Sequence, residues 1–370
     1  MRQNNYFITL FKALFFSMII VTTSSARAEL KVVTTIKPLY SLIANVMDGV
    51  GEPSLIIEGS TSPHSFTLKP SHAKLLEEAD LIFWVGEGIE TFMEGPLESI
   101  AKNAEVVEFM EVESIEKLKF REESIFGDHD DHDDHDDHDE DHDDHDDHDN
   151  HDDHDDHDED HDDHDDHDGH DDHDDHDDHD EDHDDHDDHD DHDDHAGHEG
   201  HNHGEFDAHI WLDPSNAKEM VHEIAHELGD LDPANKDKYE ANAEATIIAL
   251  DQLIKDVSKD INKDAKFVVF HDAYQYFEER FGVRAAGALT LNTDVLPGAK
   301  QVADIQDVIK DKGINCIFSE PQFNPKIIST IAQDMNIKTG VFDPLGANIN
   351  SDKDLYFKLI SNLGNELKGC

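Results

Sequence analysis

The chain has 370 residues and a formal net charge of −63. It is long enough for two domains of ordinary size, and its charge excludes a protein that binds the phosphate backbone of nucleic acid. The charge is uneven: 44 acidic residues and no Lys or Arg lie between Asp128 and His195, which leaves −19 for the rest of the chain.

The first 28 residues are typical of a secretory signal peptide. Arg2 and Lys12 are basic, the apolar run at 13–21 is too short to span a bilayer, and Ala26-Arg27-Ala28 fits the cleavage pattern. No Cys lies near the cleavage point, which argues against a lipid anchor. We therefore expect export to a bacterial periplasm, no direct insertion into the membrane, and a monomer.

The segment after the signal alternates between short apolar runs and helical patterns. The run Leu81–Val85 (LIFWV) is continuously apolar, as expected for a strand buried on both faces. This order of elements predicts a parallel α/β sheet with right-handed crossovers. The expected strands are at 31–35, 54–57, 81–85 and 105–109, with helices at 38–47, 70–79 and around 92–93, and a further helix at 215–228 closed by Gly229.

A tract at 128–203 interrupts this first lobe. It holds 25 of the 31 His, repeats Asp-Asp-His, and has Ala196 as its one apolar residue. It cannot bury a core, so we expect disorder, and its imidazoles and carboxylates are ligands that Zn²⁺ accepts. A solubilising polyelectrolyte with incidental metal affinity is the alternative. The expected ligands include His129, His132, His135, His195, His198, His201 and His203.

A long helix is predicted after the first lobe. Asp232 is a capping carboxylate and Pro233 suits the first helical position. Apolar residues then recur at helical spacing, without Gly or Pro, to about Asn262. Such a rod of roughly 45 Å would act as a strut between two lobes and argues against a large hinge.

The alternation of strands and helices restarts at about residue 264 and predicts a second parallel-sheet lobe. The domains are therefore a signal peptide at 1–28, a first α/β lobe at 29–231 with the tract at 128–203, a connecting helix at 232–263 and a second α/β lobe at 264–370. Cys316 and Cys370 are the two cysteines. In an oxidising compartment an even pair indicates one disulfide, with two free thiols as the alternative.

Four candidate metal ligands lie at or near strand ends, where open α/β sheets bind ligands. His64 follows the loop after the second strand, His209 ends the tract, His271 follows FVVF, and Asp343 follows KTGVF. Two come from each lobe, so they can converge between the lobes as a near-tetrahedral zinc site. Glu320, after INCIFS, is either a hydrogen-bond acceptor behind a ligand imidazole or a fifth ligand.

Three other histidines lie on expected helices away from strand ends. His222 and His226 have the i, i+4 spacing that can hold a metal on one helix face, and His72 stands alone. We interpret all three as surface residues.

Several motifs resemble those of the zinc-binding components of bacterial ABC importers, the ZnuA type. The resemblance covers essentially the whole chain after the signal, apart from the tract. The motifs are SPHSFTLKPS (62–71), ADLIFWVGEGIETFM (79–93), DAHIWLDP (207–214), FVVFHDAYQYFEERFG (267–282), CIFSEPQFNP (316–325) and DPLG (343–346).

The resemblance implies two α/β lobes joined by one long helix, with Zn²⁺ bound in the cleft and delivered to an inner-membrane ABC permease. It implies His64, His209 and His271 as ligands, with Asp343 completing or flanking the site. Manganese-selective relatives carry Glu where this chain has His271, and nitrogen in place of oxygen favours zinc. Some zinc members have Glu before the first His, where this chain has Pro63, which leaves Asp343 or water as the fourth ligand.

The resemblance also implies that Cys316 pairs with Cys370, and that a His-rich loop is common at the position of the tract. We expect the tract to act as accessory, low-affinity zinc capture or sensing. Three alternatives remain: a metal buffer in which the tract is the main binder, a nickel or manganese receptor on the same fold, and a zinc hydrolase. The last is disfavoured because the sequence holds no HExxH, P-loop or Ser-His-Asp order.

Overall fold

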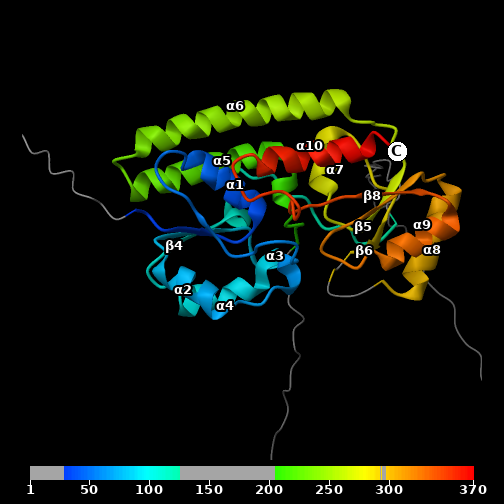
Figure 1. Ribbon diagram of the computed structural model, residues 1–370, viewed down its shortest axis with the longest axis horizontal. Helices are drawn as coiled ribbons and strands as arrows, with labels where there is room; N and C mark the ends of the chain where they lie inside the picture. The colour runs from blue at the N-terminus through cyan, green and yellow to red at the C-terminus, as the bar shows by residue number, and fades with distance from the viewer. Residues whose placement is uncertain (1–28, 126–204, 292, 294–296) are drawn as a thin grey trace, which may run out of the picture. The chain divides into compact units, whose positions relative to one another are not determined.

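The computed structural model describes residues 29–125, 205–291, 293 and 297–370 (Figure 1). These residues form two four-stranded parallel sheets, in the orders β2-β1-β3-β4 and β6-β5-β7-β8. The prediction of two parallel-sheet α/β lobes is therefore confirmed. The tract at 128–203 and the expected signal peptide at 1–28 lie outside the described residues.

The first sheet is built around β3, the apolar run that the sequence marked. All four residues of β3 (Leu81–Trp84) are buried, and β3 pairs with β1 and β4 on its two sides. The elements of this lobe are β1 (Val32–Thr34), α1 (Lys37–Val46), β2 (Ser54–Leu55), η1 (Pro63–Ser65), α2 (Pro70–Glu78), β3, α3 (Glu87–Glu90), η2 (Thr91–Met93), α4 (Glu94–Ser99), β4 (Glu105–Glu108), η3 (Phe109–Glu111), η4 (Ile210–Leu212) and α5 (Pro214–Leu231).

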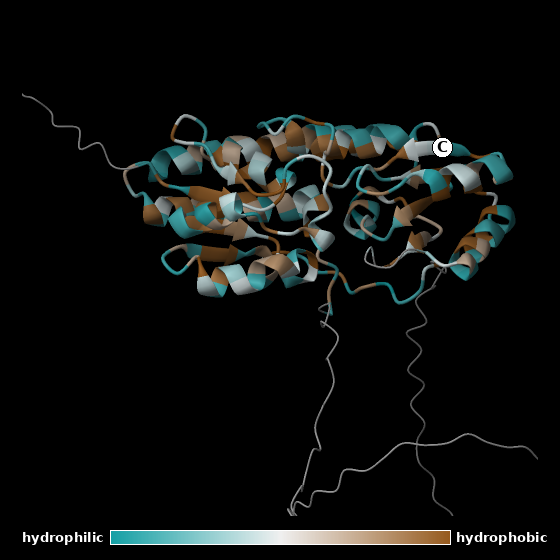
Figure 2. Cartoon of the chain, turned by 60° about the horizontal axis from the view of Figure 1, so that its bottom comes forward, coloured by the Kyte–Doolittle hydropathy of each residue, from teal (hydrophilic) through white to brown (hydrophobic). Residues whose placement is uncertain are grey.

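The second sheet is built around β5 (Phe267–His271), which is buried throughout and pairs with β6 and β7. Figure 2 shows that the strands of both sheets are largely hydrophobic, whereas loops and outer helix faces carry most of the hydrophilic colour. The further elements are α7 (Gln275–Phe281), β6 (Ala288–Thr290), α8 (Ala299–Asp311), β7 (Cys316–Ser319), α9 (Lys326–Met335), β8 (Lys338–Val341) and α10 (Leu355–Leu367).

The long helix α6 spans Lys236–Asp260, which is shorter than the predicted 232–263. Pro233 lies in a turn, because the Asp232 carboxylate accepts hydrogen bonds from Asn235 Nδ2 (2.6 Å) and Tyr239 Oη (3.2 Å) and so closes that turn. The 25 residues make a rod of about 37 Å.

The helix before this turn, α5, continues through Gly229 to Leu231, so Gly229 does not end it as the sequence suggested. A Cβ on Gly229 would lie 3.0 Å from Lys236 Cγ. The glycine therefore allows α6 to approach closely after the turn.

The helix α6 packs against α1 and α5 of the first lobe and against α10 of the second, and Figure 1 shows it running alongside α5 and α10. Its buried face includes Tyr239, Leu250 and Val257. At the α10 contact, Gly364 faces Val257, and a Cβ there would lie 2.9 Å from Val257 Cγ1. One helix thus supports both sheets.

The loop after β8 is tied to the first lobe by buried hydrogen bonds. Lys37 Nζ donates to the carbonyl oxygens of Gly346 and Ile349, each at 2.6 Å, although Lys37 itself belongs to α1. Tyr356 Oη donates to the Trp211 carbonyl at 2.6 Å. These bonds fix the region between the two sheets where the candidate ligands gather.

Cys316 and Cys370 form a disulfide, which joins the first residue of β7 to the last residue of the chain. The predicted disulfide is therefore confirmed. Among the described residues, no helix is both long and apolar enough to cross a membrane.

Candidate metal centre

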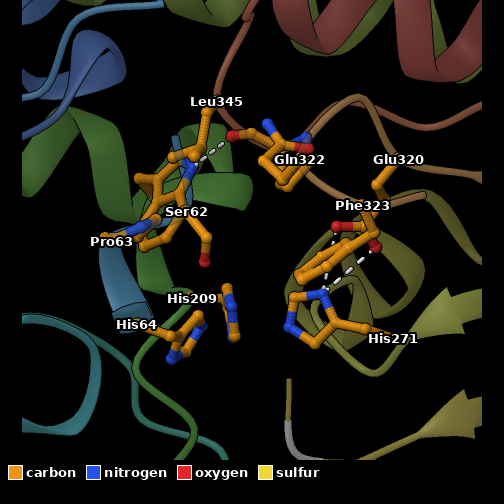
Figure 3. A pocket seen from close by; sticks show the side chains of 11 residues that line it. Ser62, Pro63, His64, His209, His271, Glu320, Gln322, Phe323 and Leu345 are labelled. Carbon is orange, nitrogen blue, oxygen red and sulfur yellow. Dashed lines mark hydrogen bonds and ion pairs between the residues drawn. The ribbon is translucent and has the colours of Figure 1, made fainter. Parts of the chain in front are cut away.

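Three imidazoles from distant parts of the chain converge between the two sheets (Figure 3). One nitrogen of each of His64, His209 and His271 lies within 4.8 Å of the others. The ring centroids are 5.5 Å apart for His64 and His209, 5.7 Å for His64 and His271, and 5.0 Å for His209 and His271. In the part of the chain that the structure describes, this is the one group of three or more such side chains with metal-binding spacing.

Local structure explains how each imidazole reaches this point. His64 lies in the single turn η1, where Pro63 occupies the first position and fixes φ for the turn. His209 precedes η4, whose Ile-Trp-Leu residues are buried and anchor it. His271 is the last residue of β5, in register with Thr290 of β6, so it points from the carboxyl end of the strand.

His209 is oriented by the carboxylate of Asp207. Its Nδ1 lies 2.7 Å from Asp207 Oδ1, and its backbone N–H donates to the same oxygen at 3.0 Å. Burial, together with the charge of His271, holds the pKa of His209 well below its ordinary value. The ring is therefore neutral, with Nδ1 used by Asp207 and Nε2 left to face the other imidazoles.

His271 is oriented by Glu320 in the same way. Its Nδ1 lies 3.1 Å from both carboxylate oxygens of Glu320, and Figure 3 shows these contacts. Its buried Nε2 has no hydrogen-bond partner among the described residues. Burial lowers the pKa of His271, but the charge and hydrogen bond of Glu320 outweigh burial and the pKa is raised. For Glu320 the sequence left two roles open, an acceptor behind a ligand imidazole or a fifth ligand, and in the structure its carboxylate lies on Nδ1 of His271.

Asp207 is a site residue that the sequence analysis did not single out. It is 1% exposed, and burial raises its pKa to about 7. The sequence carries a local signal, since a carboxylate two residues before a histidine can reach its Nδ1, but Asp-x-His is also the repeat of the tract. The sequence alone therefore did not distinguish Asp207 from the many Asp residues that precede a histidine in the tract.

The structure does not bring Asp343 into the group of three imidazoles. Its carboxylate accepts hydrogen bonds from the backbone N–H of Ala347 (2.6 Å) and Leu345 (3.2 Å) and from Gln322 Nε2 (3.1 Å). Gly346 adopts a left-handed φ of 68°, which turns the loop back so that these amides face the carboxylate. Asp343 thus stabilises its own loop.

Of the three histidines predicted to lie on the surface, His222 and His226 are exposed, whereas His72 is half-buried. His222 and His226 are exposed on α5, and His226 Nδ1 lies 3.0 Å from Glu227. The half-buried His72 accepts a hydrogen bond from the backbone N–H of Lys69 at 3.2 Å. The tract histidines, His129, His132, His135, His195, His198, His201 and His203, lie outside the described residues.

Two cavities adjoin the imidazoles. The smaller, of about 10 Å³, is lined by His64, His209, His271, Glu320 and other residues, and Figure 3 shows its walls. That volume suits one water or one ion. The larger, of about 180 Å³, is lined by the same three imidazoles and by Arg121.

The arrangement suits a borderline divalent cation such as Zn²⁺. Imidazole nitrogens are donors that zinc prefers, and each of two of these imidazoles has a carboxylate on its other nitrogen. These two carboxylates offset the double positive charge of the ion without contacting it. The fourth coordination position receives no protein donor from the described residues within the group.

Comparisons with known proteins agree with this chemistry. The sequence model of the ZnuA family, described as zinc-uptake complex component A, periplasmic, matches residues 32–370. The high-affinity zinc uptake system protein ZnuA of Brucella abortus is 45% identical over 341 residues, with 92% of this chain and 91% of that protein covered. The protein of the same name from Yersinia pestis is 30% identical, with 97% and 96% covered.

A crystal structure of ZnuA has the same fold. It superposes with a TM-score of 0.62 at 19% identity, and the match covers 91% of this chain and 98% of that one.

Proposed function

The chain belongs to the ZnuA family of periplasmic zinc-uptake components, and from this premise we propose that it is the receptor that captures Zn²⁺ and delivers it to an ABC-type permease. The observation that carries the proposal is the convergence of His64, His209 and His271, with nitrogens within 4.8 Å of one another. Zinc is the cargo of this protein rather than a resident cofactor.

His64, His209 and His271 supply the three protein ligands. Asp207 and Glu320 hold two of the rings by Nδ1, so that the opposite nitrogens face the ion without any rotation on binding. Asp343 was a candidate for the fourth position. Its carboxylate already accepts three hydrogen bonds, so we propose that solvent completes the coordination of zinc.

Release to the permease takes place with limited movement of the lobes. The helix α6 packs on both lobes, and Lys37 joins α1 to the loop after β8. A wide opening of the lobes would break these contacts together. We propose that the turn carrying His64, which is half-buried and comes from a short single-turn helix, moves when zinc leaves.

The description of the matching family as periplasmic supports a proposal for the cellular setting. We propose that residues 1–28 are a cleaved signal peptide, that the protein works in the periplasm as a monomer, and that its partner is the permease. The receptor carries out no reaction: its three imidazoles hold the ion, and the two nearest carboxylates both hydrogen-bond to histidine and are not arranged as a general base for hydrolysis.

The tract at 128–203 is proposed as accessory, low-affinity zinc capture or sensing. Its imidazoles and carboxylates are ligands that Zn²⁺ accepts, and this composition supports the proposal. A metal buffer with the tract as main binder would show no tight site after deletion of the tract.

The test is a zinc titration, with manganese and nickel competition, of the full chain and of a variant lacking 128–203, each with and without His64→Ala and His271→Ala. One tight site that survives the deletion and disappears in the double variant is expected. His72→Ala and His222→Ala are the matched controls and should leave that site intact. Loss of all tight binding on deletion of the tract would refute the proposed receptor function. Tighter binding of nickel or manganese than of zinc would show that the receptor transports a different metal.

A further inference from the structure

Arg121 lies beside the three imidazoles and has no part in the zinc coordination proposed above. It lines the cavity of about 180 Å³ together with His64, His209 and His271. We propose that Arg121 determines the metal specificity of this site by keeping neighbouring carboxylates out of the cavity, so that an incoming cation meets nitrogen donors. This proposal rests on the zinc-receptor function.

Three buried carboxylates surround the site on this side. Asp207 is 1% exposed, Asp272 is 7% exposed and Glu278 is 2% exposed. Asp272 directly follows His271 in the sequence, and Asp207 holds His209. Carboxylate oxygens are the ligands that Mn²⁺, Mg²⁺ and Ca²⁺ prefer. A site with both this oxygen-rich set and the imidazoles within reach would accept hard cations as well as zinc.

The guanidinium of Arg121 prevents this by binding two of the carboxylates at once. Nη1 donates to Asp272 Oδ1 at 2.8 Å and Nη2 donates to Glu278 Oε2 at 2.5 Å. Arg121 lines the cavity, whereas Asp272 and Glu278 do not. Arg121 therefore contacts the cavity and these two carboxylates at once.

Arginine is the residue type that this position requires. Its planar group presents several donors in a fixed fork, so one side chain can hold two carboxylates in place. A lysine would supply the charge from a single nitrogen and would hold them less firmly. The single positive charge of Arg121 does not exclude zinc, because it is outweighed by the negative charges of the nearby carboxylates when they are ionised. These carboxylates are Asp207, Asp272, Glu278 and Glu320.

The backbone around Arg121 is tied to both lobes. Lys119 forms an antiparallel bridge with Phe206, and its carbonyl accepts a hydrogen bond from Gln275 Nε2 at 2.9 Å. Three residues after Arg121, the Ser124 carbonyl accepts a hydrogen bond from the N–H of Ala288, the first residue of β6, at 2.8 Å. The segment thus crosses from the first lobe to the second, and it places Arg121 in one position between them.

The test compares Zn²⁺ and Mn²⁺ affinities of the full chain. Trp211, whose ring centroid is 5.3 Å from that of His209, supplies a fluorescence signal for the cleft, and the His64→Ala/His271→Ala variant gives the background from the tract. In Arg121→Met we expect manganese to gain at least about tenfold relative to zinc, which corresponds to about 1.4 kcal/mol. An unchanged ratio in Arg121→Met and in Arg121→Lys would overturn the proposal.

Two further variants separate specificity from general damage. Arg280→Met removes a comparable ion pair, in which Arg280 Nε and Nη2 bind Asp213 at 2.6 and 2.7 Å away from the cavity, and it should leave the ratio unchanged. Adding Asp272→Asn and Glu278→Gln to Arg121→Met should restore the wild-type ratio of zinc affinity to manganese affinity, because the competing carboxylates are gone. If manganese keeps its relative gain in this triple variant, the proposal is contradicted.

Arg121→Lys covers the case in which Arg121→Met does not fold, since lysine retains the charge but not the fork. We then expect a smaller relative gain for manganese, of about threefold, because one carboxylate is held less firmly. Failure of the receptor function itself would look different: the wild-type cleft signal would not respond to zinc, or the double histidine variant would respond equally.

Discussion

The two lobes each supply a buried histidine with a carboxylate on Nδ1, yet the pKa values of the two histidines are shifted in opposite directions. Burial and the charge of His271 lower the pKa of His209, whereas Glu320 raises the pKa of His271 despite burial. In the first pair the carboxylate itself, Asp207, has a pKa raised by burial to about 7. The same pairing of a ring nitrogen with a carboxylate therefore accompanies pKa shifts in opposite directions for the two imidazoles.

The difference shows that the two imidazoles of one metal site can differ in how strongly a proton competes with the metal ion. The lowered pKa of His209 favours the ring form that binds zinc, whereas the raised pKa of His271 makes a proton a stronger competitor with zinc for that ring. Once zinc is bound, the carboxylate behind each imidazole lies close to the positive charge of the ion and stabilises it. Variants of the two rings and of the two carboxylates behind them distinguish whether the pairs are equivalent as ligands and different in electrostatics.

The largest effect is expected from removing either imidazole. His209→Ala and His271→Ala each delete one of three nitrogen donors, so each should weaken zinc binding more than about 100-fold, beyond the range typical of carboxylates behind a ligand. Competition against a chelator of known affinity measures both. A severe loss in one variant and a mild one in the other would show that the two lobes do not contribute equally.

A smaller effect is expected from neutralising the carboxylates behind the rings. Asp207→Asn and Glu320→Gln should each cost about 10- to 100-fold in zinc affinity at pH 7. Glu320→Gln should cost more, because the raised pKa of His271 reflects the charge of Glu320, whereas Asp207 with a pKa near 7 is partly protonated at neutral pH. The same chelator competition applies, and the reverse order would contradict this account.

A separate effect, on the stability of the fold and not on zinc affinity, is expected at a buried carboxylate without a histidine partner. Glu90 is fully buried, its Oε2 accepts from the N–H groups of Val85 (2.7 Å) and Gly86 (3.2 Å), and burial raises its pKa to about 7. The folded protein therefore keeps a proton that the unfolded chain has lost, so this group lowers stability as pH rises from about 4.5 to 7.

Glu90→Gln keeps an acceptor for these N–H groups and removes the charge. Relative to wild type it should gain about 2 to 3 kcal/mol in unfolding free energy at pH 8 and little at pH 4. Urea unfolding at the two pH values measures the difference, with Glu77→Gln, exposed on α2, as the control. A variant less stable than wild type at pH 8 would refute the assignment of the destabilising charge to Glu90.

Much of the fold follows from local patterns. The apolar runs LIFWV and FVVF predicted buried parallel strands because side chains covered on both faces leave no alternating pattern. The helix α6 was predicted from spacing, but its start was placed at Pro233 because the competing use of Asp232, which accepts from Asn235 and Tyr239, depends on the folded turn.

The donor types could be read from the sequence: His271 ends a buried strand, and His64 and His209 lie in motifs, SPHSF and DAHIWLDP, that adjoin the same region. Only the tertiary structure decided what each nearby carboxylate does. Asp343 is directed to the amides of its own loop, and Arg121 meets Asp272 across 151 residues of sequence. The sequence gives the type of each residue directly. The partner of a buried charged group, however, depends on which segments pack together, and the spacing of residues along the chain does not indicate that partner.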